Sequence, residues 1–131
     1  MVKCNNSNLT GNYSYVIKNS IISQIVTELL KYKPDIIILH GSTIKNVKNL
    51  NSSDIDLVIV SDFFNHVIFF DRIKYIQNLL NKFKPLIIDA ICLTSKEFIN
   101  SIKKKKNLYY SLLKGYSILY NNQRVFFNEI F

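Results

Sequence analysis

The stretch DIIILHGS (residues 35–42), followed after eleven residues by DIDLVIV (54–60), decides the fold of this chain. Both runs are short, apolar and rich in β-branched residues, which is typical of strands that are buried on both faces. Gly41 and Ser42 end the first run, and polar residues dominate positions 43–53. Asp54 and Asp56 stand two residues apart, so the second strand would direct both carboxylates to the same face of a sheet.

A third apolar run, LIIDAICL (86–93), predicts another strand with Asp89 in its middle. If this strand pairs with 54–60, three carboxylates lie close together. Clustered carboxylates repel one another unless a cation neutralises them, and ligand sets made only of oxygen favour Mg²⁺, with Mn²⁺ as a substitute. Two such ions commonly serve in-line displacement at phosphorus. We therefore predict that Asp54, Asp56 and Asp89 are catalytic residues and metal ligands.

The turn after the first strand predicts a phosphate-binding site. Gly41 lets the backbone approach a phosphate closely, and the N–H groups that follow it suit an anion. Ser42 adds a hydroxyl donor, and Lys45 supplies a cation for the same phosphates. An isolated Asp-x-Asp pair is common in proteins, so the prediction depends on the combination of Gly-Ser, Asp-x-Asp and the later aspartate.

Outward from these strands, apolar residues recur at helical spacing over residues 15–31 and 65–83, and Pro34 and Pro85 close the two helices. Thr94 and Glu97 form a capping box that opens another helix. We predict a last helix over residues 108–114, which Gly115 caps, and then a short edge strand over residues 116–120. The predicted fold class is α/β: a small mixed sheet with helices packed on it. We divide the chain into a flexible leader (1–13), one domain (14–120) and a C-terminal tail (121–131).

Composition limits the class of protein and its partners. Of the 131 residues, 48% are apolar and 20% charged, a globular balance. The net charge of +8 suits polyanions such as nucleotides or nucleic acid, and it equally suits a lysine-rich surface that keeps the protein in solution. Cys4 and Cys92 form no disulfide framework or metal motif, and we find neither a signal peptide nor a membrane-spanning run. We expect a cytoplasmic protein that does not bind membranes.

Two other features favour the plainer of two interpretations. His40 precedes the Gly-Ser turn and could touch a phosphate, but the pattern favours a histidine packed within the strand. The lysine run 103–106 could contact nucleic acid, but a solvated helix end is the more common role of such a run. Neither histidine stands in a pattern with a serine or cysteine nucleophile, so a hydrolase triad is not supported.

The motif HGS (40–42), eleven residues and then DIDL (54–57) resembles the polymerase-beta-type nucleotidyltransferase superfamily, with Asp89 in the place of its third aspartate. The resemblance covers about residues 15–120, and the ending GYSILY (115–120) is similar to the minimal nucleotidyltransferases. It implies Mg²⁺-dependent transfer of a nucleoside monophosphate, AMP from ATP in the first instance, to a hydroxyl with release of pyrophosphate. Gly41 and Ser42 would bind the triphosphate, Asp54 and Asp56 would ligate both metals, and Asp89 would complete the second metal site.

The sequence departs from the minimal members at one point, because Lys45-Asn46 stands where many of them have Arg-Gly. Lysine binds a phosphate without the planar fork of arginine. The resemblance implies an antitoxin that adenylylates a helical HEPN-type toxin. A non-catalytic nucleotide-binding or partner-binding module and an RNA-end nucleotidyltransferase stay open as alternatives. Because the chain is small, we expect the acceptor surface to come from a homo- or hetero-oligomer.

Overall fold

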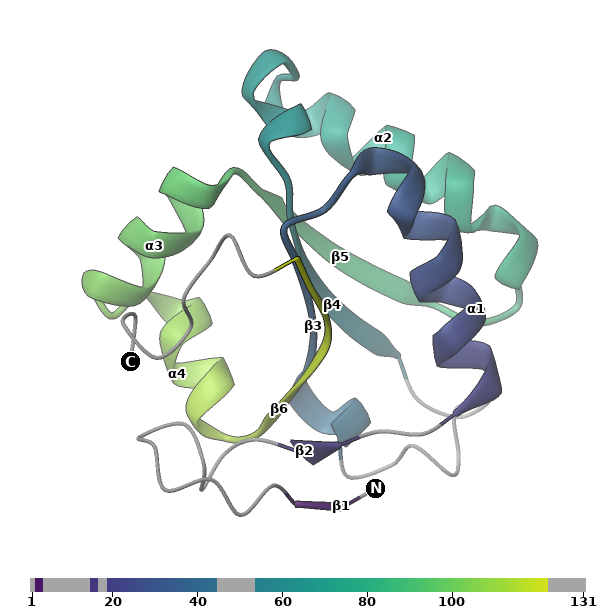
Figure 1. Cartoon of the computed structure of the whole chain (residues 1–131), viewed down its shortest axis with the longest axis horizontal. Coiled ribbons are helices and arrows are strands. Elements are labelled where there is room, and N and C mark those ends of the chain that lie inside the picture. Colours follow the sequence, from purple (N-terminus) through teal and green to yellow (C-terminus); the bar gives the residue numbers. More distant parts are fainter. Residues whose placement is uncertain (1, 4–14, 17–18, 45–53, 123–131) are drawn as a thin grey trace.

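A four-stranded mixed sheet forms the centre of the molecule, with strand order β5-β4-β3-β6 (Figure 1). The computed structural model describes residues 2–3, 15–16, 19–44 and 54–122. β3 pairs antiparallel with both of its neighbours, whereas β4 and β5 pair in parallel. The strands are β3 (Ile36–His40), β4 (Ile55–Val60), β5 (Ile88–Leu93) and β6 (Tyr116–Asn121), and a separate antiparallel pair consists of β1 (Val2–Lys3) and β2 (Tyr15–Val16).

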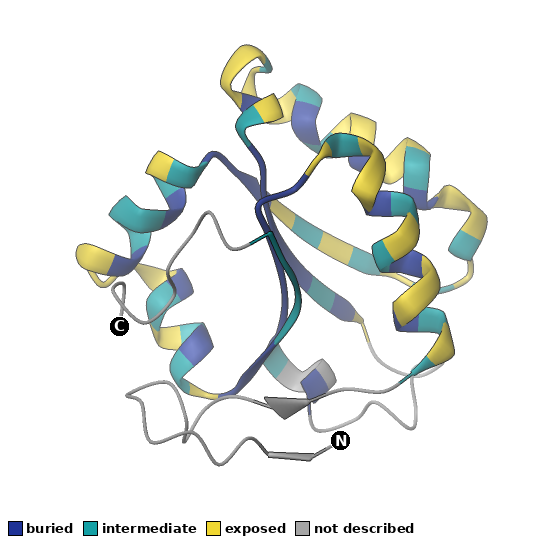
Figure 2. Cartoon of the chain, in the orientation of Figure 1, coloured by how far each residue is buried: buried dark blue, intermediate teal, exposed yellow. Residues whose placement is uncertain are grey.

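Helices cover both faces of this sheet. α1 (Ser20–Leu29) and α2 (Phe69–Leu80) lie on one face, and α3 (Ser95–Lys103) and α4 (Asn107–Leu113) lie on the other (Figure 1). Alternate strand residues therefore enter two separate apolar cores, one around Leu57 and the other around Val58. The central strands are almost wholly buried, as Figure 2 shows. Among the described residues, no helix is long and apolar enough to cross a bilayer.

The first helix starts later than its apolar spacing predicts. Residues 15–16 belong to β2, and α1 begins at Ser20 because the side chain of Asn19 accepts hydrogen bonds from the backbone N–H groups of Ile21 and Ile22. Such a cap fixes where a helix begins, whatever apolar residues precede it. β1 falls within the predicted leader, and most of the leader lies outside the described residues, as does 123–131 of the predicted tail.

Short 3₁₀ turns lie next to α1 and α2. The predicted helix 65–83 is α2 flanked by two such turns, η4 (Asp62–His66) and η5 (Asn81–Phe83). The turn η1 (Leu30–Tyr32) follows α1, and Lys33 ends it in a left-handed conformation just before Pro34. The predicted capping box is confirmed: Glu97 N–H donates to Thr94 Oγ1, and Thr94 N–H donates to Glu97 Oε1.

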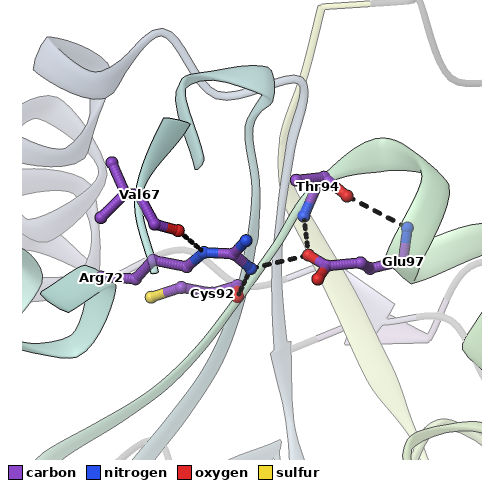
Figure 3. A network of polar contacts seen from close by, with 5 residues as sticks. All are labelled: Val67, Arg72, Cys92, Thr94 and Glu97. Carbon is purple, nitrogen blue, oxygen red and sulfur yellow. Dashed lines mark hydrogen bonds and ion pairs between the residues drawn. The ribbon is translucent and has the colours of Figure 1, made fainter. Parts of the chain in front are cut away.

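A buried arginine joins the elements around one end of the sheet (Figure 3). Arg72 of α2 donates to the backbone carbonyls of Val67 and Cys92 at 2.9 and 3.2 Å, and to Glu97 Oε1 at 2.6 Å. Only 9% of the Arg72 side chain is exposed, against 44% of Glu97. A charge buried to this degree is tolerated because it is paired with a carboxylate and makes hydrogen bonds to two backbone carbonyls. The guanidinium thus links α2, β5 and α3.

Replacing Arg72 by Met should remove this link without leaving a large void. The buried carbonyl of Cys92 and the carboxylate of Glu97 would lose their donor, so the free energy of unfolding should fall by about 2–3 kcal/mol in urea denaturation. Lys82→Met is the control, because Lys82 makes an ion pair with Glu28 on the surface and 53% of its side chain is exposed. Its cost should stay within about 0.5 kcal/mol. An equal cost for both variants would contradict the structural role of Arg72.

The stabilising effect of Glu97 should disappear in acid. Burial raises the pKa of its carboxyl, but hydrogen bonds from Thr94 and Arg72 outweigh burial, and the net pKa lies below the ordinary value. A lowered pKa means that the contribution is present above the unfolded pKa of about 4.3 and is lost as the pH falls through the folded value. Glu97→Gln should therefore destabilise the protein at pH 7, and thermal unfolding should show no difference from wild type near pH 3. A cost that does not change with pH would contradict this assignment.

Candidate active site

Four side chains form one row across the sheet, because they are register partners on neighbouring strands. Tyr116 of β6 pairs with His40 of β3, and His40 pairs in turn with Asp56 of β4. Asp56 pairs with Asp89 on the parallel strand β5. Register partners place their β-carbons about 5 Å apart on one face of a sheet. The second and third predicted strands therefore do pair, which meets the condition stated from the sequence, and the pairing brings Asp56 beside Asp89.

The three predicted carboxylates differ in exposure but influence one another electrostatically. Asp54 directly precedes β4 and is exposed, Asp56 is half-buried, and Asp89 is exposed on the edge strand β5. Burial raises the pKa of Asp56, and the negative charges of Asp89 and Asp54 raise it further. Asp54, two residues away in the sequence, and Asp89, on another strand, thus both act on the carboxyl group of Asp56.

Gly41 makes room for the most buried of these carboxylates. It follows β3 directly, opens the 3₁₀ turn η2 (Gly41–Ile44) and has a φ of +73°, a conformation that side chains rarely adopt. A β-carbon at this position would stand 2.7 Å from Asp56 Oδ2. The absent side chain therefore lets the carboxylate of Asp56 lie against the Gly41 backbone, so the turn and the carboxylates belong to one site.

The rest of the predicted phosphate-binding turn is described only in part. Ser42 lies within η2 next to Gly41. Because η2 is one short turn, a phosphate there would depend on individual backbone N–H groups and little on a helix dipole. Lys45 and Asn46 lie outside the described residues.

The residues present fit a divalent cation in their chemistry. Asp54, Asp56 and Asp89 offer only carboxylate oxygens, which hard cations prefer. The pKa of Asp56 is raised first by burial and then by repulsion from Asp89 and Asp54, and a cation would relieve that repulsion. Within the described ranges, no three His, Cys, Asp or Glu side chains already stand in a metal-binding arrangement. Binding would therefore require the carboxylates to move toward one another. A cation between them would allow this, because it neutralises the repulsion that keeps them apart.

The edge of the sheet beside Asp89 is hollowed. A hollow of about 540 Å³ lies between the end of α2 and the start of β5, where Gln77, Lys84 and Asp89 contribute to its lining. A second hollow of about 270 Å³ also reaches Gln77 and Asp89, with Ile73 and Ile91 at its sides. Asp89 therefore has open space beside it that could receive a substrate group.

Three polar residues of the structure were not predicted to have these contacts. Arg72 sits on the apolar stripe of α2, where a charged residue is a sign of a buried ion pair. Asp35, the first residue of the run DIIILHGS, is buried and accepts hydrogen bonds from Ser95 and Asn122 at 3.0 and 2.7 Å. His40 is packed within its strand, as predicted, but it also contacts α4. All three sets of contacts involve residues far apart in the sequence, and only the place of Arg72 on an apolar stripe gives a local sign of one of them.

Substituting Gly41 by Ala should cost stability in two separable ways. The left-handed φ costs an L-residue about 1–2 kcal/mol, and the new β-carbon collides with the Asp56 carboxylate. In urea denaturation, the cost of Gly41→Ala should therefore be smaller in an Asp56→Ala background, which removes the colliding atoms but leaves the φ unchanged. An equal cost in both backgrounds would mean that Gly41 and Asp56 are not coupled.

Two comparisons with known proteins find nucleotidyltransferases, and a third finds no match. A family model described as a nucleotidyltransferase domain matches residues 20–114, a range that includes Gly41, Ser42 and all three aspartates. A proposed nucleotidyltransferase from Sulfolobus solfataricus, solved by crystallography, superposes with a TM-score of 0.40 at 19% identity, over 85% of this chain and 95% of that chain. No protein with a curated description matches the chain.

The family match covers most of the chain and includes the strands that carry the carboxylates. The resemblance inferred from the spacing of HGS and DIDL is thereby confirmed, as is the predicted fold class of a small mixed sheet with helices packed on it. The chain belongs to the nucleotidyltransferase-domain family of polymerase-beta-like proteins, whose general activity is nucleotidyl transfer.

Proposed function

We propose that this protein is a Mg²⁺-dependent nucleotidyltransferase that moves AMP from ATP to a hydroxyl group and releases pyrophosphate. One observation carries the proposal: Asp56 lies in register with Asp89, with Asp54 close by and the Gly41 turn against the same carboxylate. Family membership gives the reaction class, and this arrangement supplies residues suited to it.

Each residue has a defined part in the proposed reaction. The backbone of Gly41 and Ser42, with Lys45 nearby in sequence, would bind the triphosphate, and Asp54 and Asp56 would hold the cation. The cation, when bound, neutralises phosphate charge and makes the acceptor hydroxyl more acidic. Asp89 would accept the hydroxyl proton while the acceptor oxygen forms a bond to the α-phosphorus. The bond from that phosphorus to the bridging oxygen breaks, and pyrophosphate leaves with the electron pair.

We favour a partner protein as the acceptor, with one of its hydroxyl groups receiving the AMP. The hollow beside Asp89 is open at the free edge of β5, so an outside group can approach the proposed proton acceptor. The resemblance to minimal nucleotidyltransferases suggests a helical HEPN-type toxin as this partner, with the present chain as its antitoxin.

A second candidate acceptor is the end of an RNA chain, which the net charge of +8 favours. The lysines of the run 103–106 are all exposed, at the end of α3 and before α4. Phosphate contacts release counterions, so RNA binding of this kind should weaken steeply between 50 and 200 mM salt, on the order of 10³-fold for six contacts. Binding that stays constant over this range would argue against RNA.

Label transfer from α-labelled ATP into a cell extract tests the proposal. With Mg²⁺ present, the wild type should transfer label, and Asp54→Asn/Asp56→Asn should reduce the rate by about 10²-fold or more because the charges that hold the cation are gone. Asp71→Asn is the matched control, since Asp71 lies in the first turn of α2, outside the carboxylate row, and should leave transfer unchanged.

Protease or ribonuclease digestion then identifies the acceptor. Label that protease removes indicates a protein acceptor, and label that ribonuclease removes indicates RNA. If the Asp54/Asp56 variant transfers label as fast as wild type, the proposed site is wrong. If no nucleotide is transferred by the wild type, a non-catalytic module that binds nucleotide or a partner becomes the better account.

A further inference from the structure

His40 lies inside the protein with only half of its hydrogen-bonding capacity used. Its relative exposure is 7%, and its Nδ1 lies 2.9 Å from the hydroxyl of Ser111 on α4. The other ring nitrogen, Nε2, is buried and has no hydrogen-bond partner among the described residues. A buried polar atom without a partner destabilises the fold, so such an atom calls for a functional explanation.

The position of His40 in the sheet suggests what that partner is. His40 stands directly beside Asp56 in the carboxylate row, and it immediately precedes Gly41, against which Asp56 Oδ2 lies. Their β-carbons are about 5 Å apart on the same face, as register partners are. Asp56 is the least exposed of the three carboxylates, and His40 is its neighbour in the row.

The chemistry of the ring favours a donor at Nε2. A neutral imidazole carries one N–H and one lone pair, and the buried surroundings of His40 favour the neutral form. If the Ser111 hydroxyl donates to Nδ1, the proton of the ring is on Nε2. Negative charge on the nearby carboxylates favours this tautomer, because an N–H facing them is attracted while a lone pair is repelled.

We propose that His40 is a positioning residue for Asp56: Ser111 holds the ring through Nδ1, and Nε2–H donates to the Asp56 carboxylate when that carboxylate binds a cation. The inference rests on the proposed function. An ionised carboxylate has about four lone-pair sites, so one carboxylate can bind a cation and accept this hydrogen bond together. Carboxylates that ligate metals are usually oriented by such bonds, and losing one typically weakens metal binding 10–100-fold.

Binding of Mn²⁺ alone, measured from the electron paramagnetic resonance signal of free Mn²⁺, tests the inference without catalysis. His40→Phe keeps a ring of similar size but removes both nitrogens, and it should weaken Mn²⁺ binding by about 10-fold or more. His40→Gln places an amide near the position of Nε2 and should restore binding to within about threefold of wild type. His40→Asn keeps only the position of Nδ1 and should behave like His40→Phe. Ser111→Ala should give an intermediate loss, since it frees the ring.

Thermal unfolding of the same variants separates a positioning role from a packing role. If His40→Phe and His40→Asn unfold at lower temperature but bind Mn²⁺ as tightly as wild type, His40 is only a packing residue and the inference is overturned. Should His40→Phe fail to fold, His40→Asn and Ser111→Ala carry the test. A loss that occurs with ATP present but not with Mn²⁺ alone would also overturn the inference, because Nε2 would then contact the nucleotide.

Wild-type protein that binds no Mn²⁺, even with an ATP analogue present, would contradict the proposed function itself and the inference with it. Asp56→Asn is the reference for a site that has lost a ligand and should bind Mn²⁺ more weakly than His40→Gln. Failure of the inference and failure of the proposed function therefore give different results in the same measurement.

Discussion

The parallel pairing of β4 with β5 sets two negative charges side by side on a sheet that is otherwise apolar and covered on both faces. The register of this pairing places Asp56 beside Asp89, and Asp54 adds a third charge from the residue just before β4. Repulsion among these groups opposes folding, and the buried cores on either side of the sheet must outweigh it. An arrangement that costs stability in this way is typical of a functional site.

The other features of the site follow from where this pairing leaves the carboxylates. The carboxylate of Asp56 lies so close to residue 41 that a β-carbon there would collide with it. Gly41 avoids the collision and also adopts the left-handed turn. Asp89 is on the edge strand, so it is exposed and lies beside open space. His40 separates the carboxylates from the buried Tyr116, which makes it the natural residue to hold Asp56 from within.

Local patterns predicted most of the fold. The three apolar runs became β3, β4 and β5. Runs of four or more apolar residues suit strands buried on both faces, as β3 and β4 are, whereas β5 lies at the edge of the sheet and exposes Asp89 and Ile91. The capping box at Thr94 placed the start of α3. The start of α1 was misplaced although Asn19 offered a capping signal, because the apolar spacing upstream of it also fitted a helix.

What the sequence could not give is register and contact between distant segments. The runs that form β4 and β5 are apolar at almost every position, so a slip of one residue leaves the apolar pattern almost unchanged. The pairing of Asp56 with Asp89 could therefore only be stated as a condition. His40 and Ser111 are 71 residues apart, and Arg72 and Glu97 are 25 apart, so their contacts depend on how α4 and α3 dock. The motif located the site, whereas contacts such as those of His40 with Ser111 could be seen only in the folded structure.

Ligand-dependent thermal unfolding tests the central claim most directly, because it needs no knowledge of the acceptor. The wild type would be heated with Mn²⁺ and a non-cleavable ATP analogue, each alone and both together, beside Asp54→Asn/Asp56→Asn. A ligand present at 100 times its dissociation constant stabilises by about 2.7 kcal/mol, which raises the melting temperature of a domain of this size by several degrees. The account predicts this rise for wild type with both ligands and its loss in the variant. An equal rise in the variant would show that the nucleotide binds elsewhere, and no rise in wild type would contradict the site altogether.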